Sequence, residues 1–266
     1  MSNTSRILVT ALIVTSLGNN LAAQAAPAAP AAPAAPTASA KPTIVLVHGA
    51  FADGSSWSKV IPILQRDGYT VIAVQNPLTS FAADVETTKR VVDAQAGPVV
   101  LVGHSYGGAV ITQAAAGSAN VKALVYVAAF APEVGEPIGA FGERYPTQLG
   151  TGFRPDKAGF LYIDPTRFHE LFAADVPVAE TRVAAATQKP IIGSVFGATL
   201  DQAAWKTIPS WYIVSQDDKA INPDLERFYA NRMKAKTTEI KSSHVPFLSH
   251  PAEVARVIEQ AAAGAH

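Results

Sequence analysis

The chain has 266 residues, 48% of them hydrophobic, and its 21 basic and 21 acidic side chains leave no net formal charge at pH 7. This balance excludes the basic surface of a nucleic-acid-binding protein, so no nucleic-acid partner is predicted. The chain has no cysteine, which excludes disulfides and thiolate metal sites, so packing alone must stabilise the fold.

The first 25 residues have the pattern of a secretory signal peptide. Arg6 precedes an apolar run from Ile7 to Leu17, and small residues follow up to Ala25. The apolar run is too short to span a bilayer, so no stable membrane span is predicted. We expect cleavage after Ala25 and export to the periplasm or the medium. Residues 26–41 repeat Ala-Ala-Pro, which favours an extended linker.

Residues 42–266 are predicted to form one catalytic domain, because strand and helix patterns alternate without another low-complexity break. The expected strands are 43–48, 70–75, 99–102, 123–129, 211–215 and 238–241. The expected helices are 57–68, 81–96, 109–116, 223–234 and 251–263, with Pro223 and Pro251 in first turns. This alternation predicts an α/β fold with a mostly parallel sheet and helices on both faces.

The alternation stops between about 131 and 207. Glycines and prolines are scattered there among aromatic residues such as Phe141, Tyr145, Phe153, Phe172 and Phe196. This composition predicts an inserted cap of short helices above the site, and an apolar pocket beneath it.

The stretch Gly103-His104-Ser105-Tyr106-Gly107 satisfies the G-x-S-x-G pattern between a buried strand and a helix. Such a sharp turn strains the serine backbone and places its hydroxyl at the carboxyl end of the sheet. Ser105 is therefore predicted to be a nucleophile.

A serine nucleophile needs an imidazole to take its proton and a carboxylate to orient that imidazole. On this arrangement of strands the order is serine, acid, histidine, each just beyond a strand. His244 follows the last predicted strand, and we predict it as the base, with His250 bordering the final helix instead. Asp218 is the predicted acid because its loop leads into a helix, and Asp217 stays the alternative.

The tetrahedral intermediate of acyl transfer requires two N–H donors for its oxyanion. Tyr106 N–H, directly after the nucleophile, is one candidate. The second is Ala50 N–H in the loop His48-Gly49-Ala50-Phe51, with Phe51 the alternative, and Gly49 lets the loop approach closely. No histidines have ligand spacing with carboxylates, so neither a metal nor a cofactor is predicted.

These motifs together resemble the α/β-hydrolase superfamily, and in particular its small esterase-like members, which are similar to plant methyl esterases and hydroxynitrile lyases. The resemblance rests on the His48 loop, the Ser105 turn, Asp218 before Pro223, and His244 before Pro246-Phe247. It implies a core sheet of about eight strands, with the cap inserted after the strand that ends near Ala129.

The predicted function is hydrolysis of a small carboxylic ester or lactone through an acyl-enzyme, with Ser105, His244 and Asp218 as the triad. One alternative is a hydroxynitrile-lyase-like enzyme, for which the resemblance implies a pocket lysine, and Lys236 is the candidate. Another is a non-catalytic protein that binds a small ligand on the same fold. The patterns leave thioesters open and do not indicate an oligomeric state.

Overall fold

The computed structural model describes residues 41–265. The predicted signal peptide and all but the last residue of the predicted linker lie outside this range, and both stay predictions. None of the helices in the described part is long and apolar enough to cross a membrane.

A six-stranded parallel sheet forms the centre of the described fold. Its strands follow the order β2 (Val71–Val74), β1 (Thr43–Val47), β3 (Val99–His104), β4 (Val121–Val127), β8 (Ser210–Ser215) and β9 (Lys236–Ile240). Each lies within two residues of the predicted range. The expectation of about eight strands is wrong for this sheet, because the described chain enters β1 almost directly and no strand of residues 41–265 precedes it.

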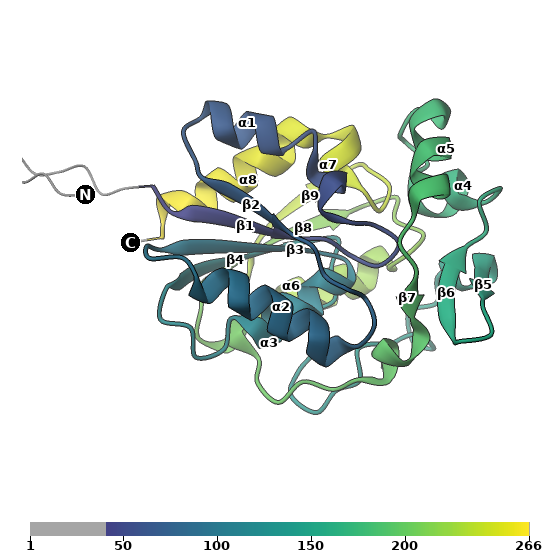
Figure 1. The fold of residues 1–266 in the computed structure, drawn as a ribbon, viewed down its shortest axis with the longest axis horizontal. Helices are drawn as coiled ribbons and strands as arrows, with labels where there is room; N and C mark the ends of the chain where they lie inside the picture. The colour runs from purple at the N-terminus through teal and green to yellow at the C-terminus, as the bar shows by residue number, and fades with distance from the viewer. Residues whose placement is uncertain (1–40, 266) are drawn as a thin grey trace, which may run out of the picture. The chain divides into compact units, whose positions relative to one another are not determined.

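Helices cover both faces of the sheet, which explains why β3 begins with four apolar residues and is buried along its whole length. In Figure 1, α1 (Ile61–Arg66) and α8 (Pro251–Ala263) lie on one face. The other face carries α2 (Phe81–Asp93), α3 (Tyr106–Ala114) and α6 (Pro223–Met233). The short α7 (Pro246–Ser249) precedes α8.

The helix predicted over 57–68 is divided in two. The 3-10 helix η1 ends at Trp57 (Gly54–Trp57), and α1 begins at Ile61. Pro62 is in the first turn of α1, where its missing N–H costs nothing. An unbroken helix would instead set the Pro62 ring against the carbonyl of Ser58, so the chain starts a new helix.

The cap, 131–207, is only partly helical, which corrects the prediction. Its helices are α4 (Phe168–Phe172) and α5 (Val178–Thr187), with 3-10 turns η2 (Leu149–Gly152), η3 (Gly193–Gly197) and η4 (Ala204–Lys206). It also contains an antiparallel sheet of β5 (Phe153–Pro155), β6 (Phe160–Ile163) and β7 (Ile191–Ile192). Gly159, at φ +84°, closes the turn between β5 and β6. Pro155 is tolerated because β5 is an edge strand.

Candidate active site

Ser105 sits at the turn between the end of β3 and the start of α3. Its φ of 53° and ψ of −124° are a strained conformation for a residue with a Cβ. The neighbouring glycines permit this turn: a Cβ on Gly103 would lie 2.6 Å from the carbonyl oxygen of Gly107, and a Cβ on Gly107 would lie 2.7 Å from that of His48. The sequence therefore folds into the sharp turn, from which the serine hydroxyl points toward His244.

Three side chains that are distant in the sequence form one hydrogen-bonded chain. Asp218 Oδ2 lies 2.5 Å from His244 Nδ1, and His244 Nε2 lies 2.8 Å from Ser105 Oγ. Because the carboxylate faces Nδ1, that nitrogen carries the hydrogen and Nε2 is free to accept from the serine hydroxyl. All three residues are buried. The arrangement can therefore move a proton from Ser105 to His244.

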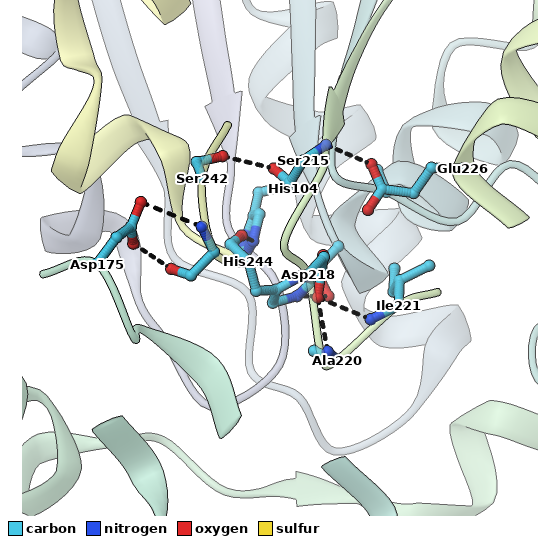
Figure 2. A network of polar contacts seen from close by, with 12 residues as sticks. His104, Asp175, Ser215, Asp218, Ala220, Ile221, Glu226, Ser242 and His244 are labelled. Atoms are coloured by element: carbon cyan, nitrogen blue, oxygen red, sulfur yellow. Dashed lines mark hydrogen bonds and ion pairs between the residues drawn. The ribbon is translucent and has the colours of Figure 1, made fainter. Parts of the chain in front are cut away.

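The loop after β8 decides which aspartate reaches the imidazole. The side chain of Asp218 turns inward, and its Oδ1 accepts hydrogen bonds from the backbone N–H groups of Ala220 (2.6 Å) and Ile221 (3.0 Å). Figure 2 shows these two bonds. Asp217 is exposed, and only its backbone N–H is engaged, with the carbonyl of Ser242. Asp218 is thus the aspartate that contacts His244.

Glu226, on α6, is a buried carboxyl group that the sequence patterns did not single out. Its Oε2 accepts from Ser215 N–H at 3.0 Å, and its Oε1 has no partner among the described residues. Burial, with the negative charge of Asp218 as a second cause, raises the pKa of Glu226 well above its usual value. Burial and the adjacent Asp218 thus both favour the protonated form of Glu226, because ionisation would place a second negative charge behind Asp218.

The loop after β1 runs close to the nucleophile. A Cβ on Gly49 would lie 2.7 Å from Ser105 Cβ, so glycine is required for this approach. His48 fixes the loop, since its Nδ1–H donates to Gly49 O at 2.8 Å and its Nε2 accepts from Asn76 N–H at 3.1 Å. Burial lowers the pKa of His48 to about 4, so it holds these bonds as a neutral imidazole. Ala50, the predicted oxyanion donor, lines the same cavity as Ser105.

Tyr106 is anchored by its side chain as well as by its place in α3. Its hydroxyl donates to Asp84 Oδ2 at 2.7 Å, and Asp84 Oδ1 accepts from Leu78 N–H at 2.8 Å. Burial and the nearby carboxyl of Asp84 raise the pKa of the Tyr106 hydroxyl, which keeps it a donor. As the first residue of α3, Tyr106 has no intrahelical partner for its backbone N–H, which suits an oxyanion donor.

Asp175, in the cap, holds the loop that carries His244, and no sequence motif pointed to it. Its Oδ2 accepts from Ser243 N–H at 3.1 Å, and its Oδ1 accepts from the Ser243 hydroxyl. Figure 2 shows Asp175 and Asp218 on opposite sides of His244. On the inner side, His104 Nε2–H donates to the carbonyl of His244 at 2.9 Å. The backbone that carries the His244 imidazole is therefore held from both the core and the cap.

A cavity of about 220 Å³ contains the serine. Its lining is mostly aromatic and aliphatic and includes cap residues that the sequence patterns associated with a pocket: Phe141, Tyr145, Phe153, Phe172 and Phe196. Such a lining favours an uncharged, apolar group next to Ser105.

Comparison with known proteins identifies the family of this arrangement. The sequence profile of the Alpha/beta hydrolase family matches residues 44–257. The chain belongs to this α/β hydrolase family. Alpha/beta hydrolase nvfD of Aspergillus novofumigatus is 28% identical over 244 residues, which cover 84% of this chain and 97% of that protein. Methylesterase 1 of Arabidopsis thaliana is 25% identical over 251 residues, covering 80% of this chain and 93% of the relative.

Solved structures agree on the fold. The crystal structure of polyneuridine aldehyde esterase matches this α/β hydrolase with a TM-score of 0.71 and 19% identity, over 83% of this chain and 98% of that one. The predicted family resemblance and fold class are therefore confirmed.

Other candidate residues of this α/β hydrolase lie away from the serine. Lys236 is exposed on the edge strand β9, with its ammonium 4.6 Å from the centre of the Trp211 ring, and it does not line the cavity, so the lysine expected of a lyase is not there. His250 is the N-cap residue of α8, beside that helix as predicted. A further histidine of the cap, His169, lies in α4, 3.3 Å from the Thr181 hydroxyl. Within residues 41–265 no group of three or more acidic or histidine side chains is arranged to hold a metal ion.

Proposed function

We propose that this α/β hydrolase is a serine hydrolase that cleaves a small, uncharged carboxylic ester or lactone through an acyl-enzyme. The observation that carries the proposal is the continuous hydrogen-bonded chain from Asp218 through His244 to Ser105, which ends at a strained serine in an apolar cavity. A neutral imidazole that accepts from a serine hydroxyl is the arrangement that makes an alcohol nucleophilic at neutral pH.

The first half of the reaction forms the acyl-enzyme. Ser105 Oγ attacks the ester carbonyl carbon while His244 Nε2 takes the hydroxyl proton. The backbone N–H groups of Ala50 and Tyr106 stabilise the negative oxygen of the tetrahedral intermediate, each contributing about 2.7–4 kcal/mol. The bond from the carbonyl carbon to the alcohol oxygen then breaks, and His244 delivers its proton to that oxygen. Asp218 stabilises the imidazolium throughout.

The second half releases the acid. Water attacks the acyl carbon and gives a proton to His244, and the bond to Ser105 Oγ breaks as the proton returns to the serine. An ester gives one carboxylic acid and one alcohol, a lactone gives a single hydroxy acid, and the side chains end as they began. No cofactor takes part in these steps.

The test is hydrolysis of short p-nitrophenyl esters by the purified protein and by Ser105→Ala. Wild type should show turnover and, when quenched early, a mass increase of one acyl group on the peptide that contains Ser105. The Ser105→Ala variant should retain only trace activity, with an unchanged melting temperature as evidence of folding. Turnover by a folded Ser105→Ala variant near that of wild type overturns the proposal, as does a wild-type protein inert toward every ester and lactone of a panel graded by acyl length.

A further inference from the structure

A second cavity, of about 240 Å³, lies between the cap and the core. Its cap wall comes from α4, α5 and the segment that joins them, and includes Val176 and Ala184. Its core wall comes from the chain between β1 and α1, which includes Ser58, and from α7, which includes Leu248. The Ser105 hydroxyl is not part of its lining. None of the steps of the proposed reaction involves this second cavity.

Two aromatic rings separate this space from the nucleophile. Phe51 and Phe172 line both cavities, and their ring centres are 6.2 Å apart in an edge-to-face contact. The ring of Phe172 also packs edge-to-face on the imidazole of His244, at 4.9 Å between centres. The next residue, Val245, already lines the second cavity. The second cavity is therefore directly next to the residue that carries the base.

The mechanism of acyl transfer places the two halves of an ester on different sides of the Phe51 and Phe172 rings. The acyl half is bonded to Ser105 in the intermediate, so it must occupy the cavity that Ser105, Ala50 and Tyr106 line. The alcohol half leaves with a proton from His244, so its oxygen must lie on the side of the imidazole.

We propose that the second cavity binds the alcohol half of the substrate, and that the preferred substrates among small, uncharged carboxylic esters carry an apolar group on each side of the ester bond. This inference rests on the proposed serine hydrolase function. An ester that spans both cavities passes between Phe51 and Phe172, so one ring must turn aside when the substrate binds. Rotation of a single phenylalanine side chain provides this without movement of the backbone.

The charges around the second cavity restrict the alcohol further. Asp53 and Glu180 line it, whereas no lysine or arginine is among the described residues of its lining. Lys59, just outside, pairs with Glu180 at 2.7 Å. An alcohol half that carries a carboxylate would meet these acidic groups without a free cation to balance it, so neutral alcohols are favoured.

The experiment fills the second cavity and reads selectivity in two ester series. One series has a constant acetyl group and an alcohol that grows from methyl through butyl to benzyl. The other has a constant methanol half and an acyl group that grows over the same sizes. The variant is Ala184→Phe, because Ala184 lines the second cavity and a larger side chain there would fill it. The matched control is Ala186→Phe, two residues along α5, which is exposed and outside both linings.

In Ala184→Phe, kcat/KM for benzyl acetate relative to methyl acetate should fall at least tenfold, since each CH₂ that loses its burial costs about fourfold. The same ratio in the acyl series should stay within about twofold, as should both ratios in Ala186→Phe. Ser58→Phe, at the exposed rim of the opposite wall, should repeat the alcohol-selective loss if Ala184→Phe folds poorly.

The assignment of the second cavity is overturned if, in a folded variant, the ratios of the alcohol series and the acyl series fall together, or if neither falls. If wild type hydrolyses methyl acetate and Ser105→Ala does not, the serine hydrolase function survives that outcome. A wild-type protein that hydrolyses neither series refutes the function, and the assignment of the cavity falls with it.

Discussion

Replacement of Asp175 by alanine tests whether a cap residue positions the proposed base. Asp175 accepts two hydrogen bonds from Ser243, the residue directly before His244, and its side chain is 28% exposed. Hydrogen bonds to a charged acceptor contribute about 1.5–3 kcal/mol each, and water recovers part of this where the acceptor is partly exposed. We therefore expect Asp175→Ala to cost about 2 kcal/mol, or about thirtyfold in kcat.

The assay is steady-state hydrolysis of p-nitrophenyl acetate, with kcat and KM determined separately and the melting temperature measured in parallel. Because Asp175 does not line the cavity that contains Ser105, KM should change by less than about twofold. Asp175→Asn keeps an acceptor for Ser243 N–H and should recover most of kcat. A purely structural role would instead lower the melting temperature and leave the kcat of the folded fraction intact.

Asp164 provides a matched control in the same cap. Its Oδ1 accepts from both the N–H and the hydroxyl of Thr166, at 2.9 and 2.7 Å, so this carboxylate also holds the N–H and hydroxyl of one residue, at a site that does not reach His244. Its Oδ2 pairs with Arg154 at 2.5 Å. Asp164→Ala should keep wild-type kcat. An Asp175→Ala variant with kcat within twofold of wild type, or an equal loss in Asp164→Ala, would refute the reasoning.

Three further predictions concern the core of the site. Asp218→Asn should lower kcat about a thousandfold or more, whereas Asp217→Asn should stay within about twofold; near-full activity of the first variant would contradict the assignment of the acid. Because the pKa of His48 is about 4 in the folded chain and 6.5 ordinarily, only the unfolded chain binds a proton as pH falls below 6.5. His48 alone should therefore reduce the free energy of unfolding by about 2 kcal/mol from pH 8 to pH 5, and urea titrations that show no reduction would count against its buried, neutral state. Gly49→Ala should lower kcat/KM at least tenfold, because the added Cβ would lie only 2.7 Å from the Cβ of Ser105. Gly97→Ala, with open space around it, serves as the control. Equal activities of the two variants would show that the Gly49 loop can move away without cost.

The elements that the sequence predicted best are those determined by neighbouring residues. The strand, turn and helix around Ser105 follow from an apolar run, two glycines and a short aliphatic helix, all within about fifteen residues. The cap was predicted less well because its hairpin has a loop closed by Gly159 and very short strands, so neither alternation nor a two-residue turn was available to indicate it.

Some contacts that form across the fold were not predicted from the sequence. The pattern Asp217-Asp218 leaves both carboxylates possible, and the choice is made by the Ala220 and Ile221 N–H groups, which fix the direction of one side chain. Asp175 precedes its partner Ser243 by 68 residues and belongs to a different part of the fold. Nothing in the local sequence of either residue encodes that contact, which arises only when the cap packs on the core.

The cap of this α/β hydrolase is connected to the catalytic loops by two sets of hydrogen bonds. Lys189 donates to the carbonyl of Asn76, whose own N–H donates to His48, and His48 in turn holds the Gly49 carbonyl in the oxyanion loop. Asp175 holds the loop of the base in the same way. Because the two relays start only fourteen residues apart in the cap, a shift of this segment would disturb the predicted oxyanion donor and the predicted base together. The cap is therefore part of the site's geometry as well as the wall of its cavities, and substitutions at its contacts with the core should alter kcat as well as substrate selectivity.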